Sequence, residues 1–236
     1  MKKTLKHTIK KILIFFGWSL KKRYVNKSYT NQKPNLKLLE ALHLSKGILH
    51  MGAHRGSEAP VYDWLHKKTI WVEANPKIFL DLEDYVTTFI NQKAYNILLY
   101  EEDDIKKTFK ISNNDAASSS IYEFGNSNFS SDINMIDKII LKTMKIDTFF
   151  QKERIVNNEY DFWVLDLQGA ELPTLKGATK SLGYCKYIYV EISKNDYYKN
   201  GTKWTELKQF LIKNNFQNLW EPESDHTDIL FVNKNL

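Results

Sequence analysis

The sequence predicts an α/β fold built on a mostly parallel sheet, and three observations lead to this prediction. Short apolar runs typical of buried strands alternate with segments whose apolar residues recur at helical spacing. The stretch 47–75 has the order strand, glycine turn, helix, strand, which is that of a βαβ unit. The last two expected strands follow one another without a helix, which predicts a seven-stranded sheet with an antiparallel last strand.

The βαβ unit begins with an apolar run, 48–51, that ends at Gly52. The turn Gly-Ala-His-Arg-Gly follows, and Ser57 is expected to cap a helix that carries Pro60 in its first turn and ends near His66. Gly52 and Gly56 would let the backbone turn sharply and approach a ligand closely. The alternative is that these glycines serve packing alone.

A second strand, 69–72, follows this helix and ends at Glu73. A carboxylate at this place can accept hydrogen bonds from two ribose hydroxyls, because ligands bind at the carboxyl ends of parallel strands. The glycine spacing differs from G-x-G-x-x-G, so a dinucleotide pyrophosphate is not favoured. The unit therefore predicts a site for an adenosine-type ligand.

The rest of the chain continues the alternation of elements. Helices are expected at 36–44, 78–89, from 146, from 171 and at 204–213. Further strands are expected at 94–100, 107–112, 139–145, 162–165, 187–192, 217–220 and 228–232. We expect the strand at 107–112 to lie at a sheet edge.

Three acidic residues follow later strands. Asp166 stands at the end of the buried strand 162–165 and is a candidate general base; the alternative is that it caps the turn. Glu171 opens the next helix, where a helix N-terminus by itself explains an acidic residue. Glu191 lies near the end of the strand 187–192. This position places another acidic side chain at the carboxyl ends of the strands, where a ligand is expected to bind.

Three loops carry weaker signals. The acidic run 101–104 is typical of a solvated loop, although Glu102 is a candidate for contact with an adenine edge. The small-residue run 116–120 indicates either a mobile loop or a segment that wraps over a bound ligand. His226 lies in the loop 221–227, where it is either exposed at the surface or in contact with substrate.

The net charge of +6 is unevenly distributed along the chain. Ten of the 34 Lys and Arg residues lie in residues 1–33, which contain no Asp or Glu, so the remainder has 24 basic and 28 acidic side chains. The main body is therefore not basic, which argues against nucleic acid as a partner. The single cysteine, Cys185, excludes an internal disulfide and fits a reducing cytoplasm.

Residues 1–35 form a basic arm and linker, and residues 36–236 form the main domain. The apolar run 12–18 of the arm is far shorter than the roughly 20 residues that span a bilayer. Its aromatic residues flanked by lysines suit a helix lying on an anionic membrane surface. The alternative is a helix that packs its apolar side on the domain.

Several stretches together resemble the FkbM family of S-adenosylmethionine-dependent methyltransferases. They are HMGAHRGSE (50–58), WVEANP (71–76), the serines 118–120, LDLQGAELPTLKGA (165–178) and VEIS (190–193). The family's glycine motif usually begins with Asp, where this chain has His50. A charge often found beside the methionine end of the cofactor is thus missing.

The resemblance implies a class I methyltransferase (Rossmann-like) three-layer sandwich that binds S-adenosylmethionine and releases S-adenosylhomocysteine. The expected cofactor-binding residues are Met51, Gly52, Ala53, His54, Gly56, Glu73, Ala74, Asn75, Glu102, Ser119, Asp166 and Gln168. Asp166 is the first choice as catalytic base, with His54 and Glu171 as substitutes. Substrate contacts are expected from Ser120, Glu191 and His226, and no metal site is predicted.

Three functions follow from the resemblance. The first is O-methylation of a sugar hydroxyl in bacterial surface polysaccharide (capsule or lipopolysaccharide) biosynthesis, on a nucleotide-activated or glycan-linked sugar, in the cytoplasm or at the inner membrane face. The second is methylation of a lipid-linked glycan, an amine or a peptide. The third is a non-catalytic, membrane-binding domain with the same fold.

Overall fold

The computed structural model describes residues 35–127 and 132–236 of the chain. The predicted arm and linker therefore lie outside the described residues, except for Asn35. The hypothesis that the arm lies on a membrane remains a prediction from sequence.

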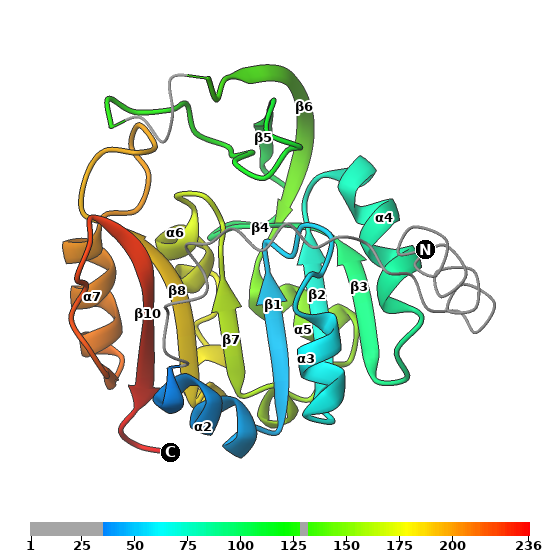
Figure 1. Cartoon of the computed structure of the whole chain (residues 1–236), viewed down its shortest axis with the longest axis vertical. Helices are drawn as coiled ribbons and strands as arrows, with labels where there is room; N and C mark the ends of the chain where they lie inside the picture. Colours follow the sequence, from blue (N-terminus) through cyan, green and yellow to red (C-terminus); the bar gives the residue numbers. More distant parts are fainter. Residues whose placement is uncertain (1–34, 128–131) are drawn as a thin grey trace, which may run out of the picture. The chain divides into compact units, whose positions relative to one another are not determined.

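The main sheet has seven strands in the order β3-β2-β1-β7-β8-β10-β9 (Figure 1). The strands are β1 (Gly47–Met51), β2 (Lys68–Glu73), β3 (Gln92–Asn96), β7 (Phe162–Leu165), β8 (Tyr187–Ser193), β9 (Phe216–Asn218) and β10 (His226–Asn233). β10 is antiparallel to both β8 and β9, and the other neighbouring strands are parallel. The predicted sheet is thus confirmed.

Helices cover both faces of this sheet. They are α2 (Leu36–Leu44), α3 (Ala59–Trp64), α4 (Pro76–Val86), α5 (Ile146–Lys152), α6 (Glu171–Lys176) and α7 (Trp204–Lys213), with short 3₁₀ turns η2 (Asn157–Glu159) and η3 (Ser181–Tyr184). Within the described ranges, no helix combines the length and the apolar character that crossing a bilayer requires.

Two hydrophobic cores arise because successive side chains of a strand point to opposite faces. On β1, Leu49 and Met51 belong to the core shared with α5, α6 and α7, whereas Ile48 belongs to the core shared with α2, α3 and α4. On β7, Trp163 belongs to the first of these cores and Phe162 to the second. The result is the predicted three-layer sandwich, with both sheet faces buried.

A second, small sheet was not predicted. It contains β4 (Leu98–Leu99), β6 (Met135–Met144) and β5 (Lys106–Ser112) in that order, with β5 at its edge as expected. The single strand predicted at 94–100 is wrong, because the Asn96 side chain donates to the backbone oxygens of Glu73 (2.7 Å) and Ala74 (3.1 Å) and the chain there leaves the main sheet. Figure 1 shows the small sheet beyond the carboxyl ends of the central strands.

The predicted cap of α3 is also wrong. The Ser57 hydroxyl donates to the Glu58 carboxylate at 2.6 Å instead of accepting from the helix, and the helix begins at Ala59. Pro60 lies in the first turn, as predicted. The helix ends at Trp64, and His66 has a positive φ of 54°, which is incompatible with its continuation.

Candidate active site

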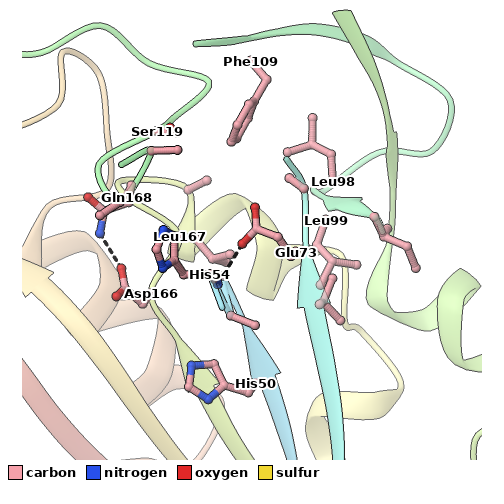
Figure 2. Close-up of a pocket in the computed structure, with 18 of the residues that line it drawn as sticks. His50, His54, Glu73, Leu98, Leu99, Phe109, Ser119, Asp166, Leu167 and Gln168 are labelled. Carbon is pink, nitrogen blue, oxygen red and sulfur yellow. Dashed lines mark hydrogen bonds between the residues drawn. The ribbon is translucent and has the colours of Figure 1, made fainter. Parts of the chain in front are cut away.

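One cavity of about 270 Å³ lies where β1, β2 and β7 end (Figure 2). The small sheet and the loop after β5 contribute its other wall. Apolar side chains make up much of the lining, namely Ile97, Leu98, Leu99, Phe109, Ile121 and Leu167. The cavity therefore combines an apolar wall with the polar strand ends of the main sheet.

The glycine turn after β1 packs tightly against the end of β7. Gly52 has a φ of +79°, and a Cβ at this position would lie 1.8 Å from the backbone oxygen of Asp166. The Gly52 and Ala53 N–H groups both donate to the Val72 carbonyl, at 2.9 and 3.0 Å. A Cβ on Gly56 would lie 2.8 Å from Leu82 Cδ1. Packing against the Asp166 backbone thus requires Gly52, which brings the ends of β1, β2 and β7 together, whereas a φ of +67° favours glycine at position 56.

Glu73 lies at the end of β2 with 8% of its surface exposed. Its Oε2 accepts from the His54 N–H at 2.9 Å, and its Oε1 accepts from the Asn75 N–H at 2.7 Å. Burial raises the pKa of Glu73, and these backbone donors oppose the rise. Because each carboxylate oxygen has a second acceptor position, Glu73 retains capacity for two further donors from the cavity.

The loop after β5 is tied to the glycine turn. His54 Nε2 lies 2.8 Å from the Asp115 carbonyl oxygen, and the Arg55 guanidinium bridges Asp81 (2.8 Å) and Asp115 (2.5 Å). His54 also has a positive φ of 47°. The His54 ring is thus occupied in holding this loop over the cavity, which weakens its candidacy as a base.

Gln168 connects the end of β7 with β8. Its side-chain nitrogen donates to Asp166 Oδ1 and, at 3.0 Å, to Glu191 Oε2 (Figure 2 shows the first of these bonds). Its side-chain oxygen accepts from the Tyr198 hydroxyl, which also donates to the Ser118 carbonyl at 3.2 Å. One amide thereby fixes two carboxyl groups beside the cavity.

The sequence suggested that His226 lies in a loop, but the structure places it at the start of β10, where it pairs with Ser193 of β8. Its Nε2 is 2.9 Å from Glu191 Oε1, and its Nδ1 is 2.9 Å from Ser193 Oγ. Desolvation lowers the pKa of His226 although Asp166 and other carboxyls oppose this. A largely neutral imidazole therefore contacts the Glu191 oxygen that Gln168 does not bind.

Glu171 is 3% exposed and caps its own turn. Its Oε1 accepts from the N–H groups of Leu167 (3.1 Å) and Gly169 (3.0 Å). Burial raises the pKa of Glu171 to about 7, against the effect of these donors. Its contacts are those of a residue that shapes the Asp166–Ala170 turn, as its place at a helix N-terminus predicted.

The family model of the methyltransferase FkbM domain matches residues 50–218. The chain belongs to this FkbM methyltransferase family. It is therefore an S-adenosylmethionine-dependent methyltransferase with the class I fold, and S-adenosylmethionine is its cofactor. A comparison with curated protein sequences finds no significant match.

Solved structures similar to this methyltransferase share little sequence with it. An rRNA methylase from Streptococcus thermophilus has a TM-score of 0.46 at 9% identity, covering 86% of this chain and 98% of its own. Magnesium protoporphyrin IX methyltransferase from Synechocystis PCC 6803 with bound SAM has a TM-score of 0.44 at 9% identity, covering 84% and 74%. A precorrin-6y C5,15-methyltransferase from Geobacter metallireducens has a TM-score of 0.44 at 13% identity, covering 89% and 92%.

Most of the predicted cofactor-binding residues of the methyltransferase line the cavity. These are Gly52, Ala53, His54, Glu73, Ala74, Ser119, Asp166 and Gln168. The expectation that Glu73 and Asp166 meet in one cleft is thus met by the geometry.

Seven predicted cofactor or substrate residues lie outside the cavity lining; two of them are Glu191, which accepts from the lining residue Gln168, and His226, which contacts Glu191. Met51 is fully buried in the core, and Gly56 packs on α4. Asn75 caps α4 by accepting from the Lys77 N–H at 3.1 Å, and Glu102 is exposed to solvent. Ser120 donates to the Gln168 carbonyl at 2.7 Å, so it positions the turn behind the cavity.

Sequence reasoning noticed His50 only as a departure from the family motif, yet this residue lines the cavity. It is 6% exposed, stacks on Trp71 at 4.7 Å between ring centroids, and has Nδ1 at 3.2 Å from the Tyr62 hydroxyl. Burial lowers its pKa to about 4, so the ring is neutral at pH 7. The structure thus has a stacked aromatic ring at the position where the family usually has a charge.

The sequence also did not predict the apolar wall of the cavity, because Leu98, Leu99 and Phe109 belong to the small sheet, which was not predicted. The described residues contain no cluster of three or more His, Cys, Asp or Glu side chains suited to hold a metal ion.

Proposed function

We propose that this methyltransferase transfers the methyl group of S-adenosylmethionine to a hydroxyl of a sugar, in the biosynthesis of a bacterial surface polysaccharide such as capsule or lipopolysaccharide. The observation that carries the proposal is a polar array in which Asp166 and Gln168 line the cavity and Gln168 also donates to Glu191. Carboxyl and carboxamide groups are suitable partners for several hydroxyls of a neutral polyol.

The cofactor fits the cavity as its residues stand. Glu73 keeps two acceptor positions for ribose hydroxyls, and Leu98 and Phe109 offer an apolar surface to a flat base at the same end (Figure 2). Asp166 and Gln168 lie at the opposite end of the labelled side chains, where the polar amino-acid portion and the reacting methyl group would be placed. The cofactor supplies an electrophilic methyl group there.

Asp166 is the proposed base. As the acceptor oxygen attacks the methyl group that the bound cofactor would supply, an Asp166 carboxylate oxygen would take up the hydroxyl proton. Because displacement at a methyl group needs the acceptor oxygen close and in line, holding the sugar contributes much of the rate, up to about 7–11 kcal/mol in well-oriented systems. Glu191 and Gln168 are the groups proposed to hold it.

The acidic groups near Asp166 also limit where an acceptor can carry negative charge. The carboxyls of Asp166, Glu171 and Glu191 lie close enough to affect each other's protonation. A phosphate placed beside them would be repelled, so a nucleotide-activated or lipid-linked sugar would keep its phosphates away from Asp166.

An acceptor survey with methyl-labelled S-adenosylmethionine tests the proposal. The panel contains free sugars, nucleotide-activated sugars, oligosaccharides, lipid-linked glycans, amines and peptides. We expect label in a sugar fraction as a methyl ether, which survives mild base where a methyl ester does not. Transfer only to an amine or a peptide would overturn the sugar assignment, and an Asp166→Asn enzyme serves as the control for non-enzymatic transfer.

The basic arm would hold the enzyme at an anionic membrane surface, close to lipid-linked intermediates. This part of the proposal rests on the sequence of residues 1–33, which lie outside the described residues. Deletion of residues 1–33 should abolish sedimentation with phosphatidylglycerol vesicles and preserve turnover on a water-soluble acceptor. Unchanged vesicle binding by the truncated protein would contradict it.

A further inference from the structure

Four carboxyl groups gather where β7, β8, α6 and β10 meet beside the cavity: Asp166, Glu171, Glu191 and Asp228. In the part of the chain that the structure describes, no lysine or arginine forms an ion pair with any of them. Among the described residues, their basic partner is the imidazole of His226, which contacts Glu191. Full ionisation of these neighbouring like charges is unfavourable, most of all at Glu171, which is buried, and Glu191, which is half-buried, whereas water reaches Asp166 and Asp228.

The geometry selects two of these carboxyls as a pair. The Gln168 amide nitrogen donates to an oxygen of Asp166 and an oxygen of Glu191, which brings both carboxyls to one NH₂ group. The two carboxyls also lie close enough to each other for a direct side-chain hydrogen bond. Since an ionised carboxylate has no proton to donate, a direct bond between two carboxyls requires a proton on one of them.

We propose that Asp166 and Glu191 share a proton in the free enzyme, and that the pair releases it to solvent when the positively charged sulfonium form of the cofactor binds. The neutral thioether product, S-adenosylhomocysteine, would leave the proton in place. The pair thereby distinguishes methyl donor from product by charge, and Asp166 becomes a competent base only with the donor bound.

The largest effects of the surroundings favour a protonated pair in the free enzyme, whereas the hydrogen bonds from Gln168 lower the pKa of both carboxyls. Desolvation and then repulsion by Glu191 raise the pKa of Asp166, although part of its side chain faces the open cavity, where water limits the rise. Desolvation and then Glu171 and Asp228 raise the pKa of Glu191 to about 8. His226, whose pKa desolvation lowers, does not supply the missing positive charge.

Two tyrosines, Tyr198 and Tyr189, are further titratable neighbours. Tyr198 contacts Gln168 and Ser118, and Tyr189 donates to Asp228 Oδ2 at 3.1 Å. Desolvation raises the pKa of both hydroxyls, so each is neutral at pH 7. They donate hydrogen bonds without adding charge, which leaves the shared proton as the means by which the pair balances its charge.

A positive charge placed at the Asp166 end of the cavity would reverse this balance, because a nearby cation favours the ionised form of a carboxyl. By linkage, a ligand whose binding releases a proton binds more tightly as pH rises. The affinity for the donor should therefore increase by up to about tenfold per pH unit between pH 6 and 8, and the affinity for the product should change little.

The test is isothermal titration calorimetry of the full chain in two buffers of different ionisation enthalpy, phosphate and Tris, at pH 7.5. The difference in apparent enthalpy gives the number of protons released for each ligand bound. We expect release of about 0.5–1 proton with S-adenosylmethionine and close to none with S-adenosylhomocysteine. Glu191→Gln should reduce the release, because Asp166 then loses its carboxyl partner and is ionised beforehand.

Asp166→Asn provides a second variant that removes the pair, and it should abolish the difference between the two ligands. Glu223→Gln, an exposed carboxyl in the loop before β10, is the matched control and should behave as wild type. Equal proton release with both ligands, or unchanged release in Glu191→Gln, would overturn the inference.

The inference rests on the proposed role of Asp166 as the base, but different experimental outcomes would overturn the shared proton and the proposed function. Normal binding of both ligands without a difference in proton release would overturn the shared proton and leave the acceptor survey intact. Absence of binding by either ligand would overturn both the inference and the cofactor site.

Discussion

The two ends of the cavity each present a carboxyl group at the tip of a strand, but the surroundings of these groups differ. Glu73 accepts backbone N–H groups on both oxygens, from His54 in the glycine turn at 2.9 Å and from Asn75 after β2 at 2.7 Å. Asp166 accepts from the side chain of Gln168 and contacts a second carboxyl, Glu191. The first carboxyl is fixed by the main chain, and the second depends on side chains.

This difference matches the roles proposed for the two residues, Glu73 in binding and Asp166 in chemistry. Backbone donors hold Glu73 in one orientation, which suits a group that must accept the same hydroxyls in every turnover. Asp166 has neighbours that make its charge conditional, which suits a group that must take up and release a proton. Residues of one chemical kind at comparable strand ends thus acquire different functions from their hydrogen-bond partners.

The largest effect should come from Asp166→Asn, because the amide keeps the size of the side chain and removes the base. Turnover on the acceptor found in the survey should fall by about two to four orders of magnitude. Calorimetry should show that S-adenosylhomocysteine still binds within a few-fold of wild type. Turnover within threefold of wild type would exclude Asp166 as the base.

Gly52→Ala tests the packing that brings the two ends together. The added Cβ would meet the Asp166 carbonyl oxygen at 1.8 Å in a backbone conformation with φ of +79°, so we expect a loss of about 2–4 kcal/mol in the free energy of unfolding. Gly183→Ala is the matched control, since a Cβ there meets nothing within 4 Å. Urea unfolding that shows equal stability for both variants would refute the proposed packing role.

Much of the fold could be predicted because its signals are local. The strand Phe162–Leu165 and the helices Leu36–Leu44 and Trp204–Lys213 have the predicted bounds, since burial imposes an uninterrupted apolar run or a helical period on each. The small sheet escaped prediction because Leu98–Leu99 pairs with Thr143–Met144 far along the chain. No glycine or proline marks the point near Asn96 where the chain changes sheet.

The site was likewise predictable only where its signals are local. Glu73 and Asp166 follow apolar strands directly, and parallel topology places such residues at one edge of the sheet. The contact between Glu191 and His226 depends on the register of β10 against β8, in which His226 lies opposite Ser193. Register between distant strands cannot be read from a polar segment such as Asp225–Asp228, which by itself resembles a loop.

Glu73→Gln examines the fixed end of the cavity. One oxygen becomes an NH₂ group that faces a backbone N–H donor, so the variant loses an acceptor for ribose and gains a repulsive contact. S-adenosylhomocysteine affinity should fall by about 10- to 100-fold in calorimetry, equivalent to about 1–3 kcal/mol. Glu83→Gln on the exposed face of α4 is the control, and an equal loss in both variants would contradict a specific role for Glu73.

The smallest effect should be in the pH dependence of stability of the free enzyme. The pKa of Glu191 is raised to about 8 in the folded protein, so between pH 6.5 and 8 the folded state binds more protons at this group than the unfolded state does. Stability must then fall as pH rises through this window, by about 1–2 kcal/mol for one such group. His50, with a folded pKa of about 4, loses stabilisation only below pH 6.5, so it does not contribute to the change.

Thermal unfolding of the free enzyme between pH 6.5 and 8 measures this fall directly. Glu191→Gln removes the titrating group and should flatten the profile, while Glu223→Gln should keep the wild-type slope. Glu171, with a pKa of about 7, contributes a fall of the same sign in both variants, so the comparison rests on the difference in slope. If Glu191→Gln loses stability as steeply as wild type, Glu191 is ionised in the free enzyme, and the carboxyl pair then has its charge balanced by some means other than a shared proton.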